Sequence, residues 1–401
     1  FSGITTIGGN VKVGTGITLS PDGDGFFTGV TTATTFSGSG ANLTNLPAAN
    51  LTGTLPAIDG SNLTGVSSPA ANRNFIINGA MRFWQRGTTF NSQGNGQNDY
   101  TTDRFAIGHN NSHMAAVTQQ DGTGADDKFQ YCARVQRDSG NSQTDQMRFH
   151  TALETNDVIL LRGETLTISY YARKGANYSE ANSQISGVRI ATGENTDGDP
   201  NAYSGGSWTN ASTILTGTPT LTTSWQRFSH TTSAVSSSAN SMIIEFRNTP
   251  VGTAGANDYY EITGVQLEIG SSATAFEHRK YSDELRSCQR YCFRLGGSLG
   301  GNAEVGTVLA MGVQSHSTSC KTHIQHPVTM RDEDITFTFA DLTVDDDVSS
   351  YAAHRVESVQ EVKSSATSSS LIFTTDTMGT VNATRVLVDS AGGYIQGECE
   401  L

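Results

Sequence analysis

Residues 42–66 read NLTNLPAANLTGTLPAIDGSNLTGV, a stretch that repeats two short phrases. Asn-Leu-Thr occurs three times and Leu-Pro-Ala occurs twice. Each unit offers one or two leucines, an extended step before proline and a turn, so it cannot bury its apolar face alone. The repeats are also too short for a solenoid. We therefore expect identical chains to wind around a common axis with the leucines inside, and we predict a homotrimeric shaft.

The polar, glycine-rich composition of this stretch extends over residues 1–69. Val11, Val13 and Ile17 suggest short alternating strands that are broken at glycines. A Ser-Ser-Pro hinge closes the region at Pro69, and aromatic residues and arginines become more frequent after it. We assign residues 1–69 to a repetitive, trimeric, intertwined β shaft.

The region from residue 70 to 280 shows the pattern of half-buried strands. Residues 164–173, ETLTISYYAR, alternate apolar and polar side chains. In a later segment the buried phase changes at Gly264, which a β-bulge explains. Several strands at this spacing predict a β-sandwich of the jelly-roll type over residues 70–280. The further strand segments are Trp225–Phe228, Met242–Phe246 and Tyr259–Ile269.

One helix is predicted in the chain, followed by a second β domain. Residues 281–293, YSDELRSCQRYCF, follow the helical period, with Ser282 as the expected N-cap, so we assign 281–295 to a linking helix. Strand patterns then return, and residues 296–401 are assigned to a smaller C-terminal β domain at the tip. The predicted fold class is all-β. The strands expected there are 305–313, 335–339, 371–374, 386–388 and 394–401.

Composition and charge exclude several classes of partner. The net charge of −13 argues against binding a nucleic-acid backbone, which needs clustered Lys and Arg. No apolar run has the length of a membrane helix and none resembles a signal peptide, so no membrane insertion is expected. Because the chain opens at Phe1 inside a repetitive region, we interpret it as the distal part of a longer polypeptide.

The five cysteines are odd in number and scattered along the chain. Such a set does not form a disulfide framework. We favour small buried thiols in a chain assembled in a reducing cytoplasm, over a bridge or a metal site.

The best candidate for ligand binding is the loop of residues 195–210, NTDGDPNAYSGGSWTN. Saccharide binding needs aromatic faces for the C–H surfaces of the sugar, with amides, carboxylates or arginines for its hydroxyls. Alternatively, the aromatic rings of this loop pack back on the sandwich or on a neighbouring subunit. The candidate residues are Tyr203, Trp208, Asp197, Asp199, Asn201 and Asn210.

Other polar clusters are given structural interpretations. We predict a core role for Trp84, with Asp103 and Arg104 as a charge pair beside it. No metal site is favoured and no cofactor is expected. The weak candidates for a structural metal ion on a threefold axis are His316, His323 and His326, near Cys320.

Catalysis has little support in the sequence. A glycosidase needs two carboxylates across one bond, and although Glu194, Asp197 and Asp199 are near one another, nothing marks a pair. Neither a nucleophile elbow nor a phosphate-binding loop is visible. We expect that the protein is not an enzyme.

Three segments carry a resemblance to a known group of proteins. The first is TTATTFSGSGANLT at 31–44, leading into the repeats. The second is NRNFIINGAMRFWQRG at 72–87 with YTTDRF at 100–105, and the third runs from VQLEIG at 265–270 through FEHR to CQRY at 288–291. Together they resemble the tail fibres of marine bacteriophages, especially those that infect cyanobacteria. The match spans roughly residues 27–292, and the closing domain matches more loosely.

This resemblance implies a homotrimeric fibre whose middle domain is similar to a carbohydrate-binding jelly roll. The function expected from it is attachment to the host bacterial surface through a polysaccharide or lipopolysaccharide. The fibre would belong to the virion, be assembled in the host cytoplasm and join upstream tail proteins. Two alternatives remain open: a purely structural fibre or capsid-surface element, and a polysaccharide depolymerase.

Overall fold

The computed structural model describes residues 10–20, 24–28, 30–32, 72–91, 98–109, 115–296, 307–345, 353–376, 378, 384–389 and 392–401. The chain divides into two compact units, Phe1–Val66 and Ser67–Leu401. In the first unit, β1 (Val11–Val13), β2 (Ile17–Leu19) and β3 (Gly25–Phe27) form an antiparallel sheet, which confirms the short strands predicted there. The repeats at 42–66 lie outside the described residues, so the trimeric shaft stays a prediction.

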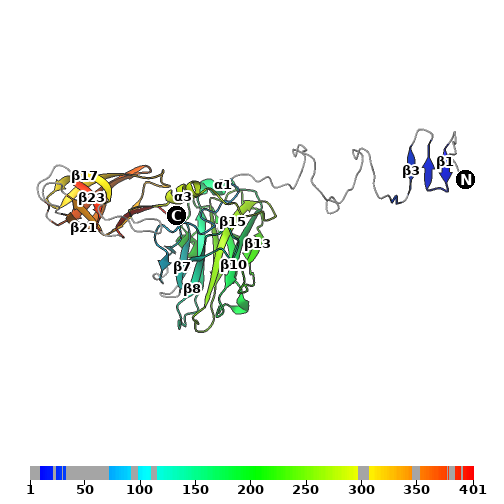
Figure 1. The fold of residues 1–401 in the computed structure, drawn as a ribbon, viewed down its shortest axis with the longest axis horizontal. Helices are drawn as coiled ribbons and strands as arrows, with labels where there is room; N and C mark the ends of the chain where they lie inside the picture. Colours follow the sequence, from blue (N-terminus) through cyan, green and yellow to red (C-terminus); the bar gives the residue numbers. More distant parts are fainter. Residues whose placement is uncertain are drawn as a thin grey trace. The chain divides into compact units, whose positions relative to one another are not determined.

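The second unit contains a sandwich of two six-stranded sheets, in which every strand pair is antiparallel (Figure 1). The chain passes repeatedly from one sheet to the other, as is typical of a jelly roll. The all-β prediction is confirmed. The first sheet has the order β13 (Gln226–Thr231), β10 (Leu166–Lys174), β15 (Tyr259–Ile269), β8 (Tyr131–Arg137), β7 (Ala115–Asp121) and β4 (Thr89–Phe90). The second sheet has the order β12 (Ser212–Gly217), β11 (Gly187–Gly193), β14 (Ser241–Asn248), β9 (Met147–Leu153), β6 (Ala106–His109) and β5 (Asn98–Tyr100).

Alternating apolar side chains of both sheets form the core of the sandwich. On β10, Leu166, Ile168 and Tyr170 are buried in it, as the alternation predicted. Tyr170 packs edge-on against Phe246 of the other sheet, with ring centroids 5.0 Å apart. The side chains of the two sheets therefore interdigitate across the layer.

The predicted β-bulge in β15 is present at Gly264. Thr263 pairs with Tyr171 and Gln266 pairs with Ser169, which leaves two residues of β15 opposite one residue of β10. Gly264 has φ 63°, a conformation that glycine adopts at little cost. The bulge switches which residues of β15 face the core.

Three short helical segments of the sandwich were not predicted. They are α1 (Thr155–Ile159), α2 (Pro200–Ser204) and the 3₁₀ turn η3 (Ala181–Ser183). Each is at most five residues long, too short to show a helical period in the sequence.

The predicted linking helix is shorter than expected. It is α3 (Tyr281–Gln289), and Cys292 already begins the next strand, β16 (Cys292–Gly296). The prediction of Ser282 as N-cap is wrong, because Lys280 occupies that position and no side chain caps the helix. β16 pairs with β24 (Tyr394–Glu398), which also pairs with β19 (Thr336–Ala340).

The remaining strands close into a barrel with its own apolar core. Phe373, Leu371 and Val386 are fully buried inside it. The C-terminal region is therefore β structure, as predicted. The barrel strands, in order, are β17 (Val308–His316), β18 (Ser319–Gln325), β22 (Ser368–Thr375), β21 (Ala353–Ser365), β20 (Leu342–Asp345) and β23 (Thr384–Val388).

A buried ion-pair network joins the last residues of the chain to the sandwich. Arg86 donates from Nε to Glu398 and from NH2 to Glu400, each over 2.8 Å. Arg104 donates to the other oxygen of Glu400, and its guanidinium lies 3.5 Å from the ring centroid of Tyr291. Two arginines near the start of the unit thus depend on carboxylates at its end.

The predicted charge pair between Asp103 and Arg104 is wrong, although the predicted core role is confirmed. Trp84, Asp103 and Arg104 are all buried, but Asp103 faces Arg86 at 3.8 Å and accepts hydrogen bonds from Gln85. Burial raises the pKa of Asp103 to about 6, and the charge of Arg86 opposes that shift.

The five cysteines are free and buried, as predicted. Among the described residues, no helix has the length and apolar character needed to cross a membrane.

We predict that the protein loses stability at acidic pH because His150 is buried. It is only 2% exposed, its Nε2 has no hydrogen-bond partner among the described residues, and burial lowers its pKa to about 4. The groups that act on it electrostatically are Glu245, Arg148 and Asp199. The folded state favours the neutral imidazole over the protonated one. The contribution of His150 to the free energy of unfolding should therefore be complete above pH 6.5, and about 3 kcal/mol of it should be lost as the pH falls towards 4.

Urea unfolding of the wild type and of His150→Gln, followed between pH 7.5 and pH 4, measures this contribution. The wild type should lose more stability than the variant over this range, because glutamine does not titrate. The exposed His316→Gln should behave like the wild type. Parallel pH curves for the wild type and His150→Gln would contradict the assignment.

Candidate functional site

The loop predicted to bind saccharide folds back onto the second sheet. Trp208 is only 5% exposed and packs on Ala191 and Ile243, which face outward from β11 and β14. Its Nε1 donates to the carbonyl of Asp199 over 2.9 Å, and its ring lies 4.9 Å from that of Tyr203. Trp208 therefore packs back on the sandwich, which is the alternative that the sequence left open for the rings of this loop.

The polar candidates of this loop mostly hold the loop itself. Asp199 caps α2 through the N–H of Asn201 at 2.7 Å, and Asp197 accepts from the N–H of Thr155. Asn210 donates to Glu194 over 2.8 Å. Tyr203 is half-buried beneath Arg189. Saccharide binding by these six residues stays a prediction.

The three candidate histidines do not form a metal site within one chain. His316 and His323 are exposed on β17 and β18, whereas His326 is buried and its Nε2 lies 2.8 Å from Ser369 Oγ. Cys320 faces the barrel interior. In the parts of the chain that the structure describes, no group of three His, Cys, Asp or Glu side chains is placed to hold a metal ion.

The structure instead reveals a groove at the edge of the first sheet, which we call the Arg82 groove. It consists of two adjoining pockets of about 160 and 220 Å³ that share Arg82 and Gln130. One pocket is mostly polar and the other has an aromatic lining. The first is lined by Asn74, Asn78, Gly79, Ala80, Lys128, Phe276, Glu277, His278, Arg279 and Glu284, and the second by Phe83, Trp84, Thr88, Gln119, Tyr131 and Tyr281.

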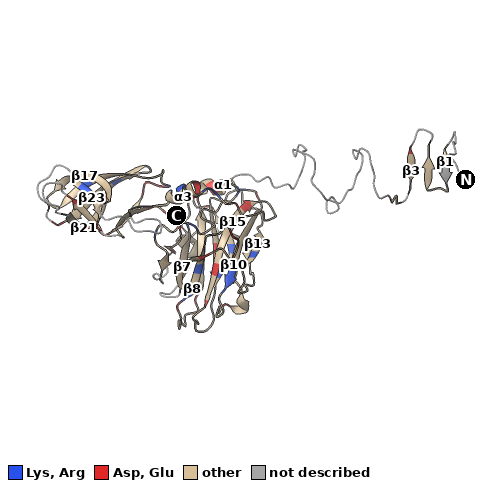
Figure 2. Cartoon of the chain, viewed as in Figure 1, with Lys and Arg blue, Asp and Glu red and all other residues tan. Residues whose placement is uncertain are grey.

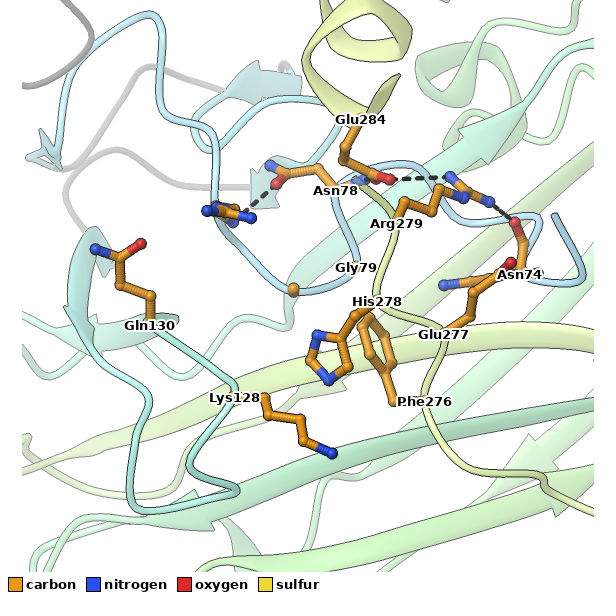
Figure 3. A pocket seen from close by; sticks show the side chains of 12 residues that line it. Asn74, Asn78, Gly79, Lys128, Gln130, Phe276, Glu277, His278, Arg279 and Glu284 are labelled. Carbon is orange, nitrogen blue, oxygen red and sulfur yellow. Dashed lines mark hydrogen bonds and ion pairs between the residues drawn. The ribbon is translucent and has the colours of Figure 1, made fainter. Parts of the chain in front are cut away.

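Ion pairs and backbone hydrogen bonds fix the walls of the first pocket. Glu277 accepts from the N–H groups of Asn72 and Asn74 at 2.5 and 2.9 Å. Arg279 donates to the carbonyl of Asn74 and lies 3.3 Å from Glu284. Figure 3 shows these residues on one side of the pocket, with Lys128 and Gln130 across from them. The two acidic groups of the lining are thus already engaged.

Asn78 fixes the loop that carries Arg82. It has φ 58°, and its side-chain amide donates to the carbonyls of Phe83 and Asp103, while Oδ1 accepts from the N–H of Arg82 over 2.8 Å. Gly79 contacts β15, where the N–H of Val265 donates to its carbonyl over 2.9 Å. Because Met81 and Phe83 point into the protein, Arg82 between them points outward.

Hydrogen-bond donors without partners remain on the surface of the groove. Among the described residues, the side chains of Arg82 and Lys128 have no ion pair or hydrogen bond. The Arg82 guanidinium lies 4.7 Å from the ring centroid of Tyr281, which is 46% exposed. Tyr131 adds a second half-exposed ring. The groove therefore offers aromatic surface beside unused donors, the combination that saccharides require.

Sequence reasoning did not find this groove. A signal was present, since Arg82 stands between two apolar residues in one segment of the phage-fibre resemblance, and the groove also uses residues of the third segment, Phe276 to Arg279. What the sequence lacks is any sign that residues 128–131 join these segments in space.

A second cluster of charges lies on the outer face of the first sheet. Unlike Arg82 in the groove, its arginines are paired with a carboxylate of the chain. Basic and acidic residues alternate across β8, β15 and β10 (Figure 2), where buried Glu261 accepts from Arg134 and Arg173 at 2.6–2.8 and 2.5 Å. Arg134 covers the ring of Tyr259 and Arg173 covers that of Trp225. The arginines of this face already bind a carboxylate and cover an aromatic ring of the same sheet. We therefore interpret this face as stabilising the fold and not as binding a ligand.

Comparisons with known proteins give structural likenesses only. No family model matches the chain, and no curated protein is similar to it. A domain of tailspike protein 4 of bacteriophage CBA120 is 10% identical with TM-score 0.32, and the match covers 49% of this chain but 22% of that one. The C-terminal family 22 carbohydrate-binding module of Clostridium thermocellum Xyn10B is 12% identical with TM-score 0.29, over 51% of this chain and 100% of the module. The K1 cleaved adhesin domain of Lys-gingipain from Porphyromonas gingivalis is 14% identical with TM-score 0.25, over 47% of this chain and 100% of the domain.

Proposed function

We propose that this chain is the distal part of a bacteriophage tail fibre that attaches the virion to a bacterial surface by binding a polysaccharide in the Arg82 groove. The observation that carries the proposal is the exposed Tyr281 beside Arg82, in a groove where the side-chain donors of Arg82 and Lys128 have no partner among the residues that the structure describes. The rings suit the C–H faces of a sugar, and the donors suit its hydroxyls. The groove is also built from two of the segments that resemble phage fibres.

The proposal includes assembly as a homotrimer through the repeats of residues 42–66, and attachment to upstream tail proteins. The ligand is a surface polysaccharide or lipopolysaccharide. Three shallow sites on one axis give an avidity that a single site lacks. The virion location and the trimer rest on the repeats and on the resemblance.

We propose binding without hydrolysis. Glycosidases use two carboxyl groups that are available to act on one glycosidic bond. The carboxylates that line the groove, Glu277 and Glu284, already accept hydrogen bonds from backbone N–H groups. A depolymerase is therefore the less supported alternative, and the release of reducing ends from host polysaccharide would contradict binding alone.

Labelling of bacterial cells with the fluorescent protein tests the site. We expect Tyr281→Ala to reduce labelling about five- to thirtyfold, because loss of one stacked ring removes about 1–2 kcal/mol of binding energy. Tyr203→Ala is the matched control, since it removes the same side chain from the loop that was predicted from sequence. Sedimentation of the same preparation should give three times the 42.5 kDa of one chain.

The two variants separate the candidate sites. Loss of labelling with Tyr203→Ala and not with Tyr281→Ala would move the site to the 195–210 loop. Unchanged labelling with both variants, or no labelling of any bacterium by the wild type, would overturn binding at either site and favour a structural fibre. A monomer in sedimentation would contradict the trimeric architecture.

A further inference from the structure

We infer that the Arg82 groove selects acidic saccharides, with the anionic substituent of the sugar held at Arg82 and Lys128. This inference rests on the proposed function and specifies its ligand class. The chemistry is that of a carboxylate or phosphate group on a sugar ring.

Among the described residues, the acidic groups of the groove have hydrogen-bonding partners, whereas two of its basic side chains have none. The carboxylates of Glu277 and Glu284 are occupied by backbone N–H groups and by Arg279. By contrast, the exposed side chains of Arg82 and Lys128 have no acceptor among the described residues. A ligand that is rich in acceptors, and best an anion, matches this surplus.

The positions of the two cations add to this argument. Arg82 lies where the two pockets meet, beside the aromatic lining of Tyr281 and Tyr131. Lys128 lines the polar pocket opposite Arg279 (Figure 3). A sugar ring that rests on the tyrosines can therefore direct a substituent towards Arg82, and a neighbouring sugar in the polar pocket lies beside Lys128. The guanidinium can bind a planar carboxylate or a phosphate in a bidentate manner.

Two other ionisable groups, His278 and Asp126, lie near the cations of the groove. His278 is a third nitrogen donor, and burial lowers its pKa, so it contributes as a neutral ring. Asp126 lies close to Lys128 and His278 outside the pocket lining, and hydrogen bonding to the N–H of Lys128 lowers its pKa. It offsets part of the Lys128 charge. At the junction of the two pockets, Arg82 has no carboxylate partner among the described residues, in a chain whose net charge is −13.

The contrast with the outer face of the first sheet supports a ligand role. There, Arg134 and Arg173 each bind the same buried carboxylate, Glu261. On the second sheet, Arg189 and Arg247 bind Glu245 in the same way. Four strand arginines of the sandwich thus bind buried carboxylates, whereas Arg82 at the groove has no carboxylate partner among the described residues.

A glycan array tests the inference with the full chain. The array carries oligosaccharides with uronic acid, sialic acid or sugar phosphate groups beside carboxyl-reduced or dephosphorylated counterparts. We expect binding to acidic glycans at least tenfold stronger than to their neutral counterparts, and the two acidic arms identify carboxylate or phosphate as the group. Stronger binding to the neutral member of each pair would overturn the inference and leave saccharide binding standing. No binding to any glycan would overturn both.

Variants locate the selectivity within the groove. Arg82→Gln and Lys128→Gln should each lower affinity for the acidic glycan at least tenfold, since a tenfold loss corresponds to about 1.4 kcal/mol and one charge-assisted hydrogen bond contributes at least that much. Arg82→Lys should retain more affinity than Arg82→Gln because it keeps the charge. Lys321→Gln, on the exposed face of the barrel strand β18, should bind like the wild type. Equal affinities for all four variants would contradict the assignment.

Discussion

Replacement of Glu400 by glutamine should lower the free energy of unfolding by about 3–5 kcal/mol. This is the typical cost of removing one partner of a buried ion pair, because the remaining charge is left buried without compensation. Glu400 receives hydrogen bonds from both Arg86 and Arg104, whose side chains are 6% and 3% exposed. Glutamine keeps the size of the side chain but leaves the two guanidinium groups with less compensating charge. The effect on stability is therefore expected to exceed the loss of a hydrogen bond alone.

Urea unfolding of Glu400→Gln and Asp332→Asn measures this difference. Asp332 lies 3.7 Å from Arg331, but its side chain is 50% exposed, and exposed pairs contribute about 0–1 kcal/mol. Both substitutions remove one negative charge next to an arginine. The difference between the two sites is that Glu400 is buried whereas Asp332 is exposed. Similar losses in the two variants would show that the network around Glu400 is not a main source of stability.

Replacement of Gly79 by alanine should destabilise the chain by about 3 kcal/mol and abolish saccharide binding. A Cβ at this position would lie 2.0 Å from the carbonyl oxygen of Val265, a backbone atom of β15 that cannot rotate away. Either β15 or the loop of residues 77–80 must move. Because this loop positions Arg82, binding should be lost even in molecules that remain folded.

The matched control is Gly205→Ala at the end of α2. There the nearest atom to an added Cβ is the carbonyl oxygen of Asn201 at 3.6 Å, which is an ordinary contact. Thermal unfolding and the glycan array should report no large change for this variant. If Gly79→Ala binds saccharide as well as Gly205→Ala does, the loop does not position the site.

Sequence patterns predicted the sandwich where apolar side chains alternate with polar ones. In β10 the alternation identified the core-facing side chains, although Thr167 and Ser169 between them are also buried, and the phase change of β15 located its bulge at Gly264. The burial of Trp208 in the 195–210 loop could not be predicted, because the loop sequence alone does not show the strands on which the ring packs. Residues 242–244 of β14 form a continuous apolar run, which is typical of a strand covered on both faces, and Trp208 supplies that cover.

The Arg82 groove could not be predicted for a different physical reason. Its walls come from residues 74–88, 119–131 and 276–284, which no local pattern connects. The linking helix was predicted too long because Cys292 also fits the helical period. Its pairing with Glu398 in β24 decides in favour of a strand, and that pairing joins residues more than a hundred positions apart.

The ion pair between Arg86 and Glu400 can form only late in biosynthesis, when the last residues of the chain have been synthesised. The two residues are 314 positions apart, so at about 5–20 residues per second the arginine emerges from the ribosome about 15–60 s before its carboxylate exists. During this interval the nascent sandwich carries Arg86 and Arg104 without the carboxylate of Glu400, which binds both of them in the folded chain. A polypeptide that is released early keeps that defect permanently, and we expect cellular proteases to remove it in preference to the finished chain.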